Sequence, residues 1–274
     1  MNALRMFLGL TTVSTLSIAA AVHAARPCPP DIDCSGTVNV NDLLSVINAW
    51  GTSGSPSDVT GDGSVNVGDL LGVINAWGAC QFTFAAQANA EAHQVGLEML
   101  GSSGPLTLPQ ANYDRIVRDI GLIRAARPEL AGQTHSAAWV PNQMLVSVPD
   151  PQAADYLCLN TYYGVTNVAP LFSTWYTLTF AGKVNVPALA EIYMASGAVS
   201  FAEPNGFVGG QNFWHPVDAG GGIWNWSIDD GWHDCFDGCD CHRQYSISID
   251  AGGAVTVQSV NQFGQRWCDF SGGT

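Results

Sequence analysis

Two stretches of the chain repeat one pattern of apolar positions. In each, large apolar residues recur at intervals of three and four, which is the spacing of one helix face. The first set is Leu43, Val46, Ile47 and Trp50, and the second is Leu70, Val73, Ile74 and Trp77. The pattern predicts two helices that bury these faces against each other.

The two predicted helices belong to a longer internal repeat. Residues 38–51 return 27 positions later as residues 65–78, with two differences. Such a repeat predicts two copies of one structural unit. Residues Pro29 and Pro30 precede the first unit and residues 51–57 precede the second, so neither unit is expected to have an entering helix.

Each unit begins with a loop that carries oxygen-bearing side chains at alternate positions. In EF-hand loops such positions surround Ca²⁺, and a glycine at the sixth position permits the sharp turn; Gly36 and Gly63 occupy that position. The predicted ligands of loop 1 are Asp31, Asp33, Ser35, the carbonyl of Thr37, Asn39 through water, and Asp42. Those of loop 2 are Asp58, Thr60, Asp62, the carbonyl of Ser64, Asn66 and Asp69. Two such loops at a fixed spacing favour two bound Ca²⁺ ions over turns that merely resemble calcium loops.

Residues 28–80 resemble the dockerin domain, which has two tandem loop-and-helix units with Asp closing each loop. The resemblance implies folding on calcium and binding to a cohesin-like or other extracellular docking protein. It also implies a link to extracellular polysaccharide breakdown. The family's partner-contact positions hold Val40, Asn41, Val67 and Gly68 instead of the usual Ser-Thr pair. The two valines also suit an intramolecular contact or a different receptor.

Charge and the amino-terminal residues narrow the partners and the location. The net charge of −14, with Lys183 as the single lysine, argues against nucleic acid and anionic membranes, which need a basic surface. Residues 1–24 have a basic start at Arg5, an apolar run and a cleavage site at Val22-His23-Ala24, which predicts a signal peptide cleaved after Ala24 and an extracellular protein. The apolar run is shorter than the ~18 residues that a membrane span needs.

Eight cysteines in an exported chain favour disulfides. Three precede residue 81 and five follow it, so either each part keeps a spare thiol or one bridge joins the parts. We expect Cys28 to pair with Cys80, with Cys34 as a competitor. In the carboxyl-terminal part we expect Cys235 with Cys239 and Cys241 with Cys268. Zinc binding by Cys235, Cys239, Cys241 and His242 is the alternative there.

The middle of the chain predicts a linker and then a mixed domain. Residues 81–137 suggest a linker with one amphipathic helix around Ile116, Ile120 and Ile123. Residues 138–210 follow a strand-helix-strand-strand-helix-strand pattern, and their motifs resemble the ferredoxin-like propeptide of subtilisin-type proteases. The resemblance implies inhibition of a subtilisin-like protease, with Glu203-Pro204-Asn205 in its active site. Reuse of the fold as a scaffold is the interpretation we favour, because fold does not determine function.

Residues 211–274 predict a small β module rich in tryptophan and cysteine. Trp224 and Trp226 share one face of a predicted strand, where they either stack on sugar rings or fill a core, and we favour the core. Asp229 and Asp230 are adjacent in that strand and point to opposite faces, so they are not a glycosidase pair. We find no other catalytic motif and expect no enzymatic activity, although a hydrolytic carboxyl-terminal domain stays an alternative.

Together these patterns predict a multidomain α+β chain. It consists of a signal peptide (1–24), an all-α dockerin-like pair of loop-and-helix units (25–80), a linker (81–137), a ferredoxin-like α+β domain (138–210) and a β module (211–274). The main hypothesis is a secreted calcium-binding docking protein. The alternatives are a protease inhibitor acting in trans and a carbohydrate-binding or hydrolytic carboxyl-terminal domain.

Overall fold

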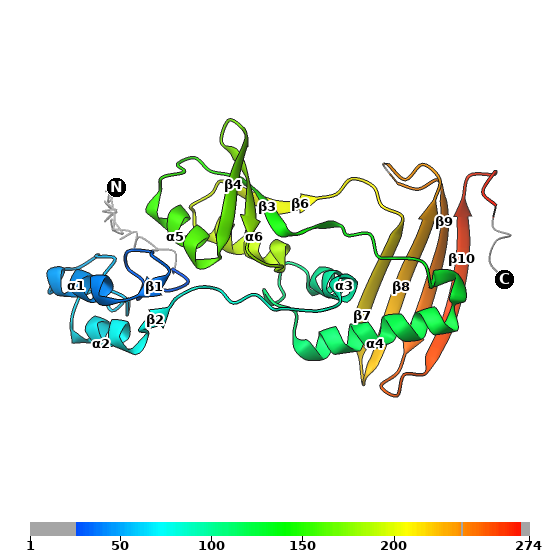
Figure 1. Cartoon of the computed structure of the whole chain (residues 1–274), viewed down its shortest axis with the longest axis horizontal. Coiled ribbons are helices and arrows are strands. Elements are labelled where there is room, and N and C mark those ends of the chain that lie inside the picture. Colours follow the sequence, from blue (N-terminus) through cyan, green and yellow to red (C-terminus); the bar gives the residue numbers. More distant parts are fainter. Residues whose placement is uncertain (1–25, 237, 270–274) are drawn as a thin grey trace, which may run out of the picture.

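The computed structural model describes residues 26–236 and 238–269, and the predicted signal peptide lies outside this range. The described residues form a mixed α+β structure with six α-helices and three antiparallel sheets. Figure 1 shows the amino-terminal module at one end, a four-stranded sheet at the other and a second four-stranded sheet between them. Among the described helices, none has the length and apolar character of a membrane span.

The amino-terminal module is not all-α, so this part of the predicted fold class is wrong. The module contains two helices, α1 (Val40–Asn48) and α2 (Val67–Asn75). Strand β1 (Thr37–Val38) precedes α1 and strand β2 (Gly78–Ala79) follows α2, and the two strands pair in a small antiparallel sheet. No helix precedes residue 40 in the described residues. The strand pair forms because the end of loop 1 meets the segment that follows α2, and backbone groups that meet there must be paired.

The predicted burial of the two helix faces is correct only in part. Val46 and Val73 are fully buried, together with Val38 and Val65. Ile47, Trp50, Ile74 and Trp77, however, are each about half exposed. The helices end at Asn48 and Asn75, so the tryptophans lie beyond the helical turns on which the predicted face depends.

Residues 139–206 follow the predicted order of strands and helices. They form β3 (Trp139–Ser147), α5 (Ala154–Tyr162), β4 (Val165–Phe172), β5 (Trp175–Phe180), α6 (Val186–Ala195) and β6 (Phe201–Gly206). The antiparallel sheet has the order β4-β5-β3-β6. Leu178 in β5, Met144 in β3 and Leu189 in α6 are fully buried in its core.

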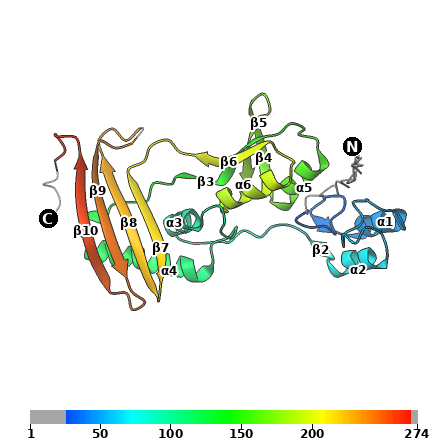
Figure 2. The same ribbon diagram turned by 180° about the vertical axis from the view of Figure 1, so that it is seen from behind.

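The second four-stranded sheet is covered by helices from the segment that was predicted to be a linker. The sheet consists of β7 (Asn212–Gly220), β8 (Ile223–Trp232), β9 (Cys241–Ile249) and β10 (Val255–Gly264), in the order β10-β9-β8-β7. Helices α3 (Ala90–Leu100) and α4 (Gln110–Ala126), followed by the 3-10 helix η1 (Pro128–Leu130), lie on one side of it (Figures 1 and 2). The segment from 81 to 137 contains the predicted amphipathic helix as α4, and it adds α3 and η1, which share a hydrophobic core with the carboxyl-terminal sheet.

One hydrophobic core runs through α3, α4, the middle sheet and the carboxyl-terminal sheet. It includes Leu97 of α3, Ile116 of α4, Val146 of β3 and Trp226 of β8. Trp214, Trp224 and Trp226 are almost fully buried on the sheet face that α4 covers. The core interpretation of Trp224 and Trp226 is confirmed, and these side chains cannot stack on a sugar.

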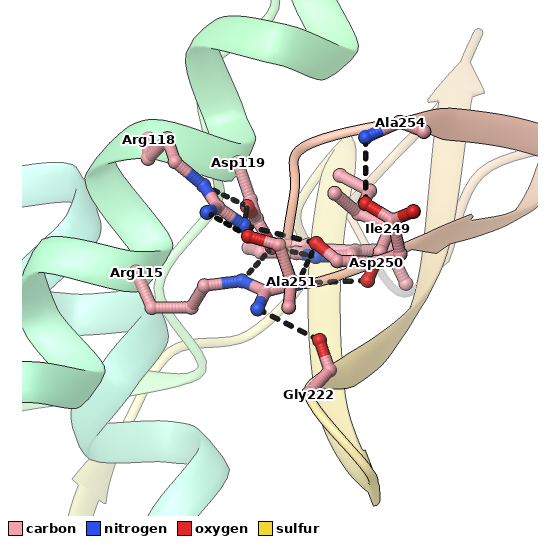
Figure 3. Close-up of polar contacts among 9 residues, drawn as sticks. Arg115, Arg118, Asp119, Gly222, Ile249, Asp250, Ala251 and Ala254 are labelled. Atoms are coloured by element: carbon pink, nitrogen blue, oxygen red, sulfur yellow. Dashed lines mark hydrogen bonds and ion pairs between the residues drawn. The ribbon is translucent and has the colours of Figure 1, made fainter.

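A buried carboxylate holds α4 against the sheet. Asp119 is inaccessible to solvent, and its carboxylate pairs with Arg115 at 2.7 Å and with Arg118 at 2.9 Å. It also accepts a hydrogen bond from Nε1 of Trp226 at 3.3 Å. The two guanidinium groups continue to the hairpin turns, where they donate to backbone carbonyls (Figure 3). These carbonyls belong to Gly222, Ile249, Asp250 and Ala251.

All eight cysteines are in disulfides. Three bonds are those predicted, Cys28–Cys80, Cys235–Cys239 and Cys241–Cys268. The fourth, Cys34–Cys158, joins the amino-terminal module to α5, which resolves the odd cysteine count of the two parts. The described residues hold no free cysteine, so Cys235, Cys239 and Cys241 offer no thiolate to zinc.

Candidate metal centre and docking surface

Loop 1 gathers three carboxylates into a group of the size that a cation requires. One carboxylate oxygen from each of Asp31, Asp33 and Asp42 lies within 4.8 Å of the others. Asp31 and Asp42 are buried, whereas Asp33 is exposed. Hard cations such as Ca²⁺ are bound by oxygen ligands of this kind. The structure therefore places three of the predicted loop 1 ligands together.

Backbone groups hold the first acid of loop 1 in place. The carboxylate of Asp31 accepts hydrogen bonds from the N–H groups of Gly36 at 2.8 Å and Ser35 at 3.0 Å. Gly36 has φ +82°, and a Cβ there would lie 2.7 Å from the amide nitrogen of Gln81. A glycine is favoured here because an L-residue is strained at this φ.

The last acid of loop 1 connects the loop to the helix. Asp42 is the third residue of α1, and its carboxylate accepts from the backbone N–H of Asn39 at 2.8 Å and of Ile32 at 2.7 Å. Asn39 in turn caps the helix by accepting from the N–H of Asn41 at 2.8 Å. Through this reciprocal capping box, the position of the Asp42 carboxylate is coupled to the first turn of α1.

The remaining loop 1 candidates lie in the same loop and bond to one another. The hydroxyl of Ser35 and the side-chain amide of Asn39 both donate to the carbonyl oxygen of Thr37, at 3.1 and 2.9 Å. Thr37 is the seventh residue of the loop, the position at which an EF-hand loop supplies a backbone carbonyl, and here both lone pairs of that oxygen accept hydrogen bonds from loop side chains.

Loop 2 repeats this geometry, also with three acids, Asp58, Asp62 and Asp69. Asp58 accepts from the N–H of Gly63 at 2.9 Å, and Asp69 accepts from the N–H of Asn66 at 2.8 Å. The hydroxyl of Thr60 donates to Asp69 at 2.9 Å. Ser64 and Asp62 complete the predicted set, with the Asn66 amide donating to Asp62 at 2.8 Å and to the Ser64 carbonyl at 3.0 Å. Within the described residues, the compact group of three acids is at loop 1.

Electrostatics differ between the two loops. Burial raises the pKa of Asp31, and the negative charge of the neighbouring Asp42 raises it further. Hydrogen bonds from the N–H groups of Gly36 and Ser35 lower it, but the net shift is upward. In loop 2, the Asn66 side chain and the Ser64 N–H lower the pKa of the exposed Asp62. For Asp69, burial acts to raise the pKa, but hydrogen bonds from Asn66 and Thr60 outweigh it, so the pKa is lowered. The crowded anions of loop 1 therefore gain the most from a bound cation.

Each of the two units exposes a row of apolar side chains, and we call the two rows together the apolar stripe. Its members are 47–58% exposed and occupy equivalent positions in the two units. They are Val40, Leu44, Ile47 and Trp50, and Val67, Leu71, Ile74 and Trp77. The charged residues of α1 and α2 are Asp42 and Asp69, and both are buried. The stripe is thus apolar and without charge.

The predicted partner-contact positions lie at the start of this stripe. Val40, Val67 and Asn41 are exposed, and Gly68 is partly exposed. Leu44 and Leu71 were missed, although they follow Val40 and Val67 by one helical turn. That spacing was a usable signal, because residues four apart share a helix face.

Loop 1 is attached to the rest of the molecule by a disulfide, whereas loop 2 contains no cysteine. Cys34, the fourth residue of loop 1, is bonded to Cys158 of α5. The N–H of Cys80 donates to the carbonyl of Gly36 at 2.9 Å, and the N–H of Phe82 donates to that of Tyr162 at 2.8 Å. Arg26 reaches Asp155 of α5 at 3.5 Å. The module is therefore attached to the middle of the molecule through its first loop.

The predicted inhibitory tail is not free. Glu203 and Pro204 pair with Leu145 and Met144 across the sheet, and the amide of Asn205 donates to Gln143 at 2.7 Å. These residues form β6 in the middle of the chain. The position gives the protease-inhibitor hypothesis no support, because a segment held in a sheet is not available to enter an active site.

Comparisons with protein-family models, with curated proteins and with solved structures gave no match.

Proposed function

We propose that the chain is a calcium-binding docking protein that binds a protein partner outside the cell through the apolar stripe. The observation that carries the proposal is the pair of loop-and-helix units with equivalent geometry. In each, an Asp of the loop is also the third residue of the helix that displays the stripe. The resemblance of residues 28–80 to dockerins supports the same function and links it to polysaccharide breakdown.

Calcium acts in this proposal by fixing the beginning of each helix. A cation between Asp31, Asp33 and Asp42 offsets their mutual repulsion and holds loop 1 against the first turn of α1. The equivalent ion in loop 2 involves Asp58, Asp62 and Asp69. Because the small core behind the helices consists mainly of Val38, Val46, Val65 and Val73, the metal supplies stability that so small a core lacks.

The chemistry of the stripe describes the partner. Half-exposed valine, leucine, isoleucine and tryptophan side chains form a surface that is favoured to lose contact with water, and tryptophan is enriched in protein interfaces. Since the stripe carries no charge, the matching face of the partner is apolar, and binding depends little on salt. A cohesin-like or other extracellular protein with such a face fits these requirements.

The calcium half of the proposal is tested by calorimetric titration of the disulfide-bonded chain with CaCl₂ after removal of metal with EDTA. We expect two ions per chain, and none for the double variant Asp42→Asn/Asp69→Asn. Asp114→Asn, an exposed substitution on α4, is the control and keeps both ions. Absence of calcium heat in the unmodified chain contradicts the proposal.

The docking half is tested with partners captured from the culture medium of the producing organism, with calcium and with EDTA. A captured partner is purified and its binding is measured with Leu44→Ser/Leu71→Ser, which we expect to weaken it at least roughly tenfold. Val117→Ser, an exposed position on α4, is the control. Equal binding of the two variants would show that the stripe is not the docking surface.

A further inference from the structure

The carboxyl-terminal sheet has one covered and one open face. Helices α3 and α4 lie on one side, and no described helix or strand covers the other (Figures 1 and 2). The side chains on the open face line up across the strands in rows of neutral hydrogen-bonding groups. The rows are Asn225-Ser248-Thr256, Ser227-Ser246-Ser259 and, beginning with an acid, Asp229-Gln244-Asn261. All nine side chains are at least partly exposed.

A cavity of about 230 Å³ lies at the end of this open face. Phe213, Asp229 and His242 line it from three neighbouring strands, and Gly210 and Cys239 line it from the segments beside the sheet. The Cys235–Cys239 disulfide closes the segment that forms this wall. Gly209, also in the lining, has φ +79°, and a Cβ there would lie 2.2 Å from the carbonyl oxygen of Cys235. The close approach of these two segments therefore requires a glycine.

The polar groups of the cavity are held in position. Nδ1 of His242 is 2.9 Å from a carboxylate oxygen of Asp229, and Nε2 is 2.8 Å from the carbonyl oxygen of Cys239. The His242 ring also stacks on Phe263, with 4.8 Å between ring centroids. The side chains of Asp229 and His242 are 25% and 23% exposed, so both remain accessible from the cavity. Groups fixed in this way lose little freedom when a ligand binds.

The lining defines the chemical class of the ligand. No lysine or arginine lines the cavity, which argues against an anion, and the carboxylate of Asp229 is already in contact with His242, which argues against a cation. Phe213 offers an apolar wall beside these hydrogen-bonding groups. A neutral ring with an apolar face and hydroxyl groups at its edge, which is a sugar, matches both. The volume is below the ~300 Å³ of the smallest drug-sized pockets, so it admits about one ring.

We propose that this cavity binds one neutral sugar ring of a glycan and that the adjoining rows of serine, glutamine and asparagine contact the rings that follow. The site binds and does not hydrolyse, because Asp230, the adjacent carboxylate, is buried on the opposite face. It also differs from the platform of Trp224 and Trp226, which is covered by α4. The proposal is independent of calcium docking.

The test uses the disulfide-bonded chain on an array of neutral oligosaccharides, with sulfated glycans included, and then titration with a fluorescently labelled oligosaccharide from the array. We expect binding to neutral glycans and a loss of roughly tenfold or more in affinity for both Asp229→Asn and Phe213→Ala. Val217→Ala, on the same sheet face but distant from the cavity, is the control and binds as the unmodified chain does.

A second measurement avoids dependence on variants that fail to fold. Hydrogen exchange of the unmodified chain, with and without the bound oligosaccharide, should slow at residues 209–213 and 238–242. No binding to neutral glycans, binding to sulfated glycans alone, or protection elsewhere on the molecule would overturn the proposal. Unchanged affinity of folded Asp229→Asn and Phe213→Ala would do the same.

Discussion

Cys34 lies inside loop 1 and is bonded to Cys158 of α5, so a candidate calcium loop is covalently attached to the middle of the molecule. The equivalent position of loop 2 is Gly61, which cannot form such a bond. Two units whose helical segments are nearly identical in sequence thus have different surroundings. The first prediction concerns the contribution of this bond to stability.

Removing the bond with Cys34→Ser/Cys158→Ser should lower the free energy of unfolding by about 2–5 kcal/mol. The bond joins residues 124 positions apart, and a crosslink over a long loop restricts the unfolded chain strongly. Urea denaturation in calcium-containing buffer measures the change. Cys235→Ser/Cys239→Ser, which opens a bond of separation 4, is the control and should have about half the effect or less. Equal losses would count against this explanation.

If both candidate loops bind calcium as proposed, their affinities should differ. Asp42→Asn and Asp69→Asn should each reduce the number of bound ions from two to one. The ion that remains in Asp69→Asn should bind more tightly, because loop 1 holds three clustered acids and is fixed by Cys34. Calorimetry on both variants measures this. Tighter binding of the loop 2 ion would contradict this prediction. It would mean that the clustered acids and the disulfide of loop 1 do not raise its affinity for the metal.

Replacing Asp119 by alanine should lower the free energy of unfolding by about 3 kcal/mol. The substitution leaves Arg115 and Nε1 of Trp226 without their buried acceptor. Tryptophan fluorescence during urea denaturation follows the loss. Asp114→Ala, five residues earlier on the exposed side of α4, should change stability by less than about 0.5 kcal/mol. A small effect of Asp119→Ala would mean that the arginines are satisfied by the turn carbonyls alone.

His93 should make stability depend on pH. Burial, and then the charge of Lys183, lower the pKa of its imidazole from 6.5 to about 4. The folded protein therefore binds fewer protons than the unfolded chain between these values. The stabilisation is complete above pH 6.5 and is lost as the pH falls toward 4.

The expected loss from His93 is about 2 kcal/mol between pH 7 and pH 5. Urea denaturation of the unmodified chain and of His93→Gln at both pH values measures it. Other groups titrate equally in both proteins, so the difference in slope belongs to His93. Parallel pH profiles of the two proteins would show that His93 is not responsible.

Local patterns in the sequence predicted local structure well. The spacing after each loop indicated helices that the structure places at Val40–Asn48 and Val67–Asn75, and alternation indicated β5 and β8. The positions of Gly36 and Gly63 in the sequence indicated the sharp turns, and in the structure both glycines have positive φ. These features depend on neighbours within a few residues, which is why the sequence alone reveals them.

Contacts between distant segments were not predictable from the same patterns. The packing of Asp119 against Trp226, 107 positions away, requires knowledge of the whole fold. Trp50 and Trp77 were assigned to a buried face because periodicity gives no information on where a helix ends. The cavity at Asp229 and His242 depends on strand register and on the Cys235–Cys239 bond, and a one-residue shift in register would separate its groups.

The attachment of loop 1 to α5 has a mechanical consequence. If a partner bound to the stripe is pulled away, the shortest covalent route for the load runs from loop 1 through sulfur to α5. The segment between β2 and α3 then bears less tension, and the small valine core of the module is shielded from unravelling from that end. Force applied to the amino-terminal module would thus pass through its side, by way of the Cys34–Cys158 bond, and not only along the backbone that leaves it.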